Sequence, residues 1–197
     1  MSKLVERPSS GRGQRRREQL IEAGVELLAE GGWPAVTTRA VAERGAANTG
    51  LIHYHFGGLP GLHAAIARKA GDAVAAPAVE SLLAAADSAA ALEALRRGVR
   101  EATADEKVQR LAVELLAGAM RDPELGGALR DGLREAREQI AAWLARLHPR
   151  WSPDRRAGMA TLVAALIDGL TMHLMLDDEL GVDAALDALE QAIGGAA

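Results

Sequence analysis

Three consecutive hydrogen-bonding rings, His53, Tyr54 and His55, form the part of this chain best suited to recognise another molecule. Three neighbouring side chains on a helix fan across most of its circumference, so they cannot all be buried. Asn48 and Thr49 come at the N-terminal end of the same predicted helix, where unpaired backbone N–H groups and the helix dipole favour a phosphate. This combination suits contacts with the phosphates and base edges of DNA. The alternative is an ordinary surface helix that carries an aromatic cluster by chance.

The residues around these rings predict two short helices joined by a tight turn. Thr37 or Thr38 can cap the first helix with its hydroxyl, and Gly45 has the backbone freedom to end it. Asn48 can cap the second helix. Two helices joined in this way match a helix-turn-helix, whose second helix enters the major groove of DNA. Gly50 inside the second helix costs about 1 kcal/mol relative to Ala, which is understandable if the backbone must come close to a phosphate.

Residues 15–66 resemble the DNA-binding domain of the tetracycline-repressor (TetR) family of transcription regulators. The resemblance rests on RREQLIEAGVELLAEGGWPAVTTRAVAERG, followed by AANTGLIHYHF and then LPGLHAAI. It implies an all-α protein with an N-terminal three-helix helix-turn-helix DNA-binding domain and a C-terminal helical ligand-binding and dimerisation domain. Two residues depart from the family pattern. Leu59 stands where the family usually has a phosphate-binding lysine, and the glycine of the turn is displaced to Gly45.

The motif match implies a role for each polar residue of this segment. Thr38 and Arg39 would anchor their helix on phosphate, and Tyr54 would reach base edges or a thymine methyl. His53 and His55 would hold the DNA backbone. The residues expected to contact DNA are Arg15, Arg16, Thr38, Arg39, Asn48, Thr49, Gly50, His53, Tyr54 and His55.

The N-terminal residues 1–13 contain Pro, Ser and Gly without periodicity and predict a flexible basic arm. Beyond this arm we expect a DNA-binding domain at 14–58 and a helical effector-binding and dimerisation domain at 59–197. A run of arginines, at positions 12 and 15–17, lies at the junction of arm and first helix. These arginines are either solvated residues of a helix start or contacts to DNA phosphates or the minor groove.

The distribution of charge favours DNA contact. Residues 1–70 carry ten Lys and Arg against six Glu, whereas residues 71–197 carry thirteen Lys and Arg against twenty-one Asp and Glu. A basic N-terminal part followed by an acidic remainder is typical of a DNA-binding protein.

The composition argues against several other classes of protein. The chain has 197 residues, of which 49% are hydrophobic and 3% aromatic, and its many Ala and Leu residues favour helix. It has no Cys, so disulfides and thiolate metal sites are excluded, and its five histidines are too dispersed to predict a metal site. No catalytic constellation is found, so neither an enzyme nor a cofactor is expected. We expect that no apolar run approaches the roughly eighteen residues that cross a bilayer, which predicts a soluble cytoplasmic protein without a membrane partner.

The second part of the chain predicts antiparallel helices with short connections. After a helix that begins near Pro60 and is kinked or ended by Pro77, the helices are expected at 88–103, 105–121, 123–147, 153–177 and 182–194. The 153–177 helix is apolar on more than one face and must be covered on more than one side. A single chain could cover it alone. A homodimer built from the last two helices explains it better, agrees with the family resemblance, and would let two reading helices bind a palindromic operator.

The same part of the chain has methionines and tryptophans in the region where the family binds small ligands. Adaptable methionines and flat indoles suit a pocket for a small apolar or aromatic effector, although plain core packing is the better explanation for each residue taken singly. The candidate lining residues are Met120, Trp143, Met159, Met172 and His173.

The sequence therefore predicts a dimeric, ligand-responsive transcription regulator, and repression is favoured over activation. An effector would favour a conformation whose two reading helices are wrongly spaced for the operator. The alternative is a helical ligand-binding or scaffold protein without specific DNA binding, which would show no salt-dependent affinity for DNA.

Overall fold

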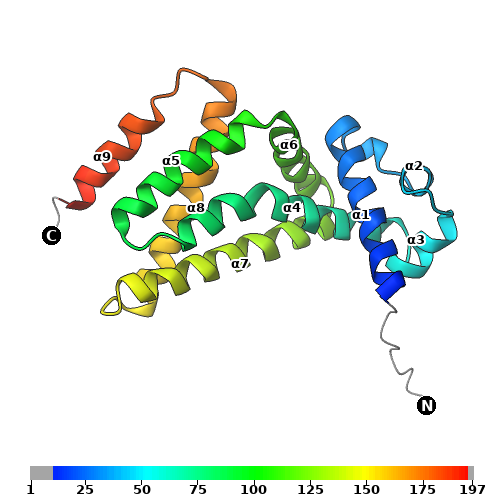
Figure 1. Ribbon diagram of the computed structural model, residues 1–197, viewed down its shortest axis with the longest axis horizontal. Helices are drawn as coiled ribbons and strands as arrows, with labels where there is room; N and C mark the ends of the chain where they lie inside the picture. Colours follow the sequence, from blue (N-terminus) through cyan, green and yellow to red (C-terminus); the bar gives the residue numbers. More distant parts are fainter. Residues whose placement is uncertain (1–10, 195–197) are drawn as a thin grey trace, which may run out of the picture. The chain divides into compact units, whose positions relative to one another are not determined.

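The computed structural model describes residues 11–194 of the chain, with side chains as far as Gln191, and this part contains helices and no strand (Figure 1). The predicted all-α fold is confirmed. The helices are α1 (Gly11–Gly31), η1 (Trp33–Ala35), α2 (Thr38–Arg44), α3 (Thr49–Phe56), α4 (Leu59–Leu83), α5 (Ser88–Ala104), α6 (Glu106–Arg121), α7 (Pro123–Leu147), α8 (Pro153–Leu176) and α9 (Val182–Gly194).

Side-chain caps explain where most of these helices begin. The Thr37 hydroxyl accepts a hydrogen bond from the Ala40 N–H at 3.1 Å, and the Asn48 side chain accepts one from Leu51 at 3.1 Å. Asp87, Asp105, Asp122 and Ser152 cap α5 to α8 in the same way. Each cap pairs a backbone N–H that the first helical turn leaves without an acceptor. The five helices predicted in the second part of the chain all form, with bounds within one residue of those expected.

Two features differ from the sequence-based expectations. Helix α1 begins at Gly11, so residues 11–13 belong to this helix and not to an arm, whereas residues 1–10 lie outside the described part. Pro77 does not end α4, which continues to Leu83. The lost backbone hydrogen bond is tolerated because Val79 and Leu82, both beyond the proline, are buried and hold the last turns in place.

The chain divides into two compact units after Lys69, within α4 and not at the expected boundary near residue 58. The first turns of α4 join the first unit because Leu62 and Ile66 are fully buried in its core. Gly24 of α1 allows this packing, since a Cβ there would lie 2.2 Å from the Ile66 side chain. The other members of this core include Leu20, Leu28, Val36, Val41 and Ile52.

The second unit has two apolar clusters. One joins Leu82 of α4 and Ala91 of α5 to α7 and α8, and the other joins Leu95 and Val99 of α5 to Val182 and Leu186 of α9. Partly buried side chains of α8 pack against both clusters.

Helix α8 is the least covered of the long helices. Ala160 is its only fully buried residue, although the helix is long and apolar enough to cross a membrane, with a mean hydropathy of 1.7 over eighteen residues. The expectation that no apolar stretch approaches this length was therefore wrong. Asp168 and His173 interrupt the run of apolar residues, but the mean hydropathy of the helix remains high enough for a membrane span. A single helix of this kind is weak evidence for a membrane span, because only its length and composition meet the criterion.

Candidate DNA interface

The turn between α2 and α3 is closed by three backbone hydrogen bonds. The N–H groups of Gly45, Ala46 and Ala47 donate to the carbonyls of Val41, Glu43 and Ala42 at 2.9, 3.1 and 2.7 Å. The only non-glycine residue with a positive φ in the described part, Ala46 at 48°, lies here. Backbone freedom at Gly45 was expected to end α2, but this glycine has an ordinary φ of −81°.

The reason for Gly45 is space and not conformation. A Cβ at this position would lie 3.0 Å from a Leu20 methyl and 3.1 Å from the Val41 carbonyl oxygen. The glycine therefore lets the end of α2 pack closely against α1, and the left-handed residue falls on the next position.

Helix α3 separates a buried face from an exposed one. Ile52 is fully buried, and Leu51 and Phe56 are partly buried. Tyr54 is 81% exposed, the largest exposed aromatic side chain of the described residues, and His53 is exposed beside it. This separation places the polar residues expected to contact DNA on the free surface of the helix.

The first turn of α3 is also exposed at Asn48, Thr49 and Gly50. A Cβ at Gly50 would lie 3.1 Å from the Asn48 side-chain oxygen, so this glycine makes room for the cap. The need for glycine at position 50 can therefore be explained by the Asn48 cap as well as by the expected close approach of DNA.

His55 is the one member of the ring trio that is partly covered. Its ring contacts Tyr54 edge-on at a centroid distance of 4.9 Å and Phe56 at 6.2 Å. Burial, and after it the charge of Arg17, lowers the pKa of His55, so the neutral ring is favoured at neutral pH. A neutral imidazole can donate one hydrogen bond to a phosphate without bringing a charge.

In the helix before the turn, Thr37 and not Thr38 forms the cap, while Thr38 is half-buried and Arg39 is exposed. The C-terminal residue Arg44 is tied to α1 by a two-pronged ion pair with Glu30, at 2.9 and 2.7 Å, and by Glu26 at 3.3 Å. The hydrogen bonds that Arg44 donates to Glu30 and, with a smaller effect, to Glu26 raise the pKa of Arg44. Sequence reasoning missed this contact because it joins residues fourteen and eighteen positions apart.

The arginines at the start of α1 lie in different places. Arg16 donates a hydrogen bond to the Ala46 carbonyl of the turn and another to Gln19 at 3.0 Å. Arg17 lies over the Phe56 ring, and Arg15 is exposed. Arg16, expected to contact DNA, thus also stabilises the turn that positions α3.

Two glycines shape the step from α3 into α4. Gly57, at a φ of 74°, ends α3 in the left-handed conformation and donates to the His53 carbonyl at 3.0 Å. A Cβ at Gly61 would lie 2.0 Å from the Phe56 carbonyl oxygen, so the first turn of α4 touches the last carbonyl of α3 directly. His63 connects the first turns of α4 to the segment before α2, because its Nε2 lies 2.8 Å from the Val36 carbonyl oxygen.

Of the candidate effector residues, the structure brings only Trp143 and Met159 together. Trp143 is buried, with its indole N–H donating to the Ala85 carbonyl at 3.0 Å, and Met159 packs against the same cluster. Met120 is 83% exposed on α6, and Met172 and His173 are exposed at the end of α8.

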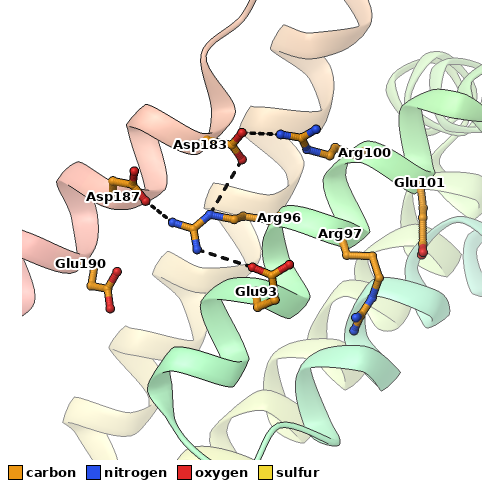
Figure 2. Close-up of a pocket in the computed structure, with 8 residues that line it drawn as sticks. All are labelled: Glu93, Arg96, Arg97, Arg100, Glu101, Asp183, Asp187 and Glu190. Atoms are coloured by element: carbon orange, nitrogen blue, oxygen red, sulfur yellow. Dashed lines mark hydrogen bonds and ion pairs between the residues drawn. The ribbon is translucent and has the colours of Figure 1, made fainter.

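The second unit does contain an open groove of about 680 Å³ between α5 and α9, lined by charged side chains and by none of these five residues (Figure 2). Arg96 is its centre, paired with Glu93 and Asp183 at 3.8 Å and with Asp187, while Arg100 pairs with Asp183. The network holds α9 on α5.

Comparison with known proteins agrees with this architecture. The family described as "Bacterial regulatory proteins, tetR family" matches residues 20–66, and "BetI-type transcriptional repressor, C-terminal" matches residues 89–196. The chain belongs to the TetR family. This TetR-family chain is 31% identical over 185 residues to the HTH-type transcriptional regulator BetI of Burkholderia mallei, covering 91% of this chain and 92% of that one.

Solved structures of TetR-like regulators have the same fold. A transcriptional regulator from Streptomyces coelicolor A3(2) superposes with a TM-score of 0.76 at 30% identity, covering 90% of this chain and 97% of that one. The multidrug-binding protein EbrR, solved with imidazole, superposes with a TM-score of 0.70 at 26% identity, covering 95% and 96%. The predicted ligand-responsive, DNA-binding transcription repressor is confirmed at the level of the family, whose members bind DNA operators and act as dimers.

Proposed function

We propose that this TetR-family protein represses transcription by placing α3 of two protomers in successive major grooves of a palindromic operator. The observation that carries the proposal is the exposed ring of Tyr54 on a short helix whose other face is buried. Tyr54 reads base edges or a thymine methyl, and His53 and His55 hold the phosphate backbone beside it.

The remaining DNA contacts come from the two helix starts. Thr38 and Arg39 bind phosphate from the first turn of α2, and Asn48, Thr49 and the Gly50 backbone bind phosphate or base edges from the first turn of α3. The exposure of Arg39, Asn48 and Thr49 supports this assignment, as does the positive end of the helix dipole. Arg15 and Arg16 add charge from α1, the latter while bound to the turn.

The dimer forms through α8 and α9. Leu162, Met172 and Leu176 are large apolar side chains of α8 left exposed by the rest of the protomer. Gly158 and Gly169 of the same helix face open space, so a second helix can approach closely. Covering this surface removes apolar area from water at about 25 cal/mol per Å².

The effector is a small apolar or aromatic compound that binds the second unit, and no further cofactor is required. Structures of EbrR with imidazole and with malachite green, each at 26% identity, support an aromatic ligand. Trp143 and Met159 line its site if the cluster around Ile140 opens, with Met120, Met172 and His173 as further candidates. The protein acts in the cytoplasm, beside the DNA, and works by binding without catalysis.

Selection of bound duplexes from a random DNA pool tests this function. We expect enrichment of a palindrome, and the mass of the complex should correspond to one dimer or a pair of dimers. Binding that is weak, salt-sensitive and blind to sequence, in protein freed of any co-purified ligand, would contradict the proposal and favour a ligand-binding protein without specific DNA recognition.

A further inference from the structure

One arginine at the start of α1 is held against the C-terminal end of α3. The guanidinium carbon of Arg17 lies 5.1 Å from the centre of the Phe56 ring, within the range of a cation–π interaction. The Phe56 ring contacts His55, and His55 contacts Tyr54. Arg17 therefore ends a row of rings that begins with the exposed Tyr54 of the reading helix.

No carboxylate among the described residues neutralises the charge of Arg17. Arg44 is paired with two glutamates of α1, Lys69 lies 2.9 Å from Glu18, and Arg16 is bound to a turn carbonyl. Among residues 11–191, no carboxylate pairs with Arg17. Its charge reaches His55, whose pKa it lowers together with burial. A half-exposed cation in this position is available to a phosphate of DNA bound along α3.

We propose that Arg17 binds a DNA phosphate beside the reading helix, and that the Phe56 ring holds its guanidinium ready for this contact. The inference rests on the proposed reading of DNA by α3. A free arginine loses rotamer freedom when it binds, whereas a planar guanidinium already resting on a ring loses less. Arg16, which is bound to the turn, adds charge near the DNA, whereas Arg17 is held on the Phe56 ring and binds a phosphate directly.

The test is the salt dependence of DNA affinity for the full-length Arg17→Gln variant. Two probes are used, the duplex recovered by selection and a random-sequence duplex of the same length. Each lost phosphate contact makes the slope of log affinity against log salt shallower by about one, so a dimer should lose about two. Affinity should fall by a similar factor on both duplexes, because a phosphate contact carries no sequence information.

Arg68→Gln is the matched control. Arg68 is an exposed cation of the same unit on α4, and it should keep the wild-type slope. A nuclear magnetic resonance titration of His55 adds an independent readout. In Arg17→Gln the pKa of His55 should move up towards its ordinary value, because one of the two causes that lower it has been removed. Phe56→Leu, which keeps Arg17 and an apolar side chain, should bind DNA several-fold more weakly than wild type.

Wild-type slope and affinity in Arg17→Gln would overturn the inference, and so would an equal loss in Arg68→Gln. If Arg17→Gln does not fold, Arg17→Lys replaces it, and a loss of slope in that charge-conserving variant would contradict a phosphate contact. If the wild type selects no sequence but Arg17→Gln still lowers the slope on random DNA, reading by α3 fails while the Arg17 contact stands.

Discussion

Helices α3 and α8 both leave one face uncovered by their own protomer, but the two faces differ in chemistry. The exposed face of α3 carries polar groups such as Tyr54 and His53, which are stable in water whether or not DNA is present. The exposed face of α8 carries Leu162, Met172 and Leu176. These side chains are more stable when another apolar surface shields them from water. The α3 face is therefore stable in water by itself, whereas the α8 face becomes more stable when another apolar surface covers it.

The largest effect on DNA affinity is expected when a charged residue is introduced on the exposed face of α8, where it would prevent dimerisation. Leu162 is 64% exposed, so Leu162→Lys should leave the protomer folded. In a dimer through α8 the lysine would be buried without a partner, at a cost of about 3 kcal/mol or more. Sedimentation equilibrium should show monomers, and affinity for a palindrome should fall at least a hundredfold. Val113→Lys on α6, a site 55% exposed, is the control and should remain dimeric. A dimeric Leu162→Lys would place the interface elsewhere.

The corresponding change on α3 is Tyr54→Ala. We expect specific DNA binding to weaken by about 1–3 kcal/mol per protomer, as for loss of one base contact. Because the ring is 81% exposed, the melting temperature and the dimer should be unchanged. Fluorescence anisotropy with the selected duplex measures the loss. Unchanged affinity would remove Tyr54 from the interface.

The junction between α3 and α4 can be tested with two glycines of one helix. Gly61→Ala forces a Cβ to 2.0 Å from the Phe56 carbonyl oxygen, so the backbone must shift, and unfolding free energy should fall by about 1–3 kcal/mol. Gly71→Ala meets nothing within 4 Å and should stabilise the protein by up to about 1 kcal/mol. Urea denaturation measures both. Equal stabilisation by the two substitutions would show that α3 and α4 do not touch in this way.

The smallest effect concerns the carboxyl on α8. Desolvation raises the pKa of Asp168 above its ordinary value, and Arg137 offsets part of this shift. The folded protein therefore binds this proton more tightly than the unfolded chain does, and the carboxyl costs stability once the pH rises through its folded-state pKa. Asp168→Asn should stabilise the protein at neutral pH by less than about 1 kcal/mol, because the side chain is only partly desolvated and the remaining contact with water screens its charge. The gain should vanish below the ordinary pKa of Asp, and a gain independent of pH would contradict this origin.

Sequence reasoning was most successful where the determinant is local. The caps at Asn48, Asp122 and Ser152 act on N–H groups two or three residues away, so their spacing is visible in the sequence. The separation of α3 into a buried and an exposed face follows from helical periodicity in the same way.

Contacts between distant segments could not be predicted. The position of Arg17 over Phe56 and the ion pair of Arg44 with Glu30 each depend on how α1 crosses the motif. Gly45 shows the same limit, because the sequence suggests a turn residue while the three-dimensional packing against Leu20 decides its role. For α8 the sequence indicated the need for cover, and the homodimer through the last two helices that would supply it stays a prediction.

The contact between Gly61 and the Phe56 carbonyl has a mechanical consequence. With no side chain between the two helices, a movement of the first turn of α4 towards α3 would meet the Phe56 carbonyl directly. A larger residue with a flexible side chain would absorb such a displacement by changing rotamer. Because Gly61 has no Cβ, the backbones of α3 and α4 are in direct contact. A small shift at the start of α4 would therefore displace the reading helix as well.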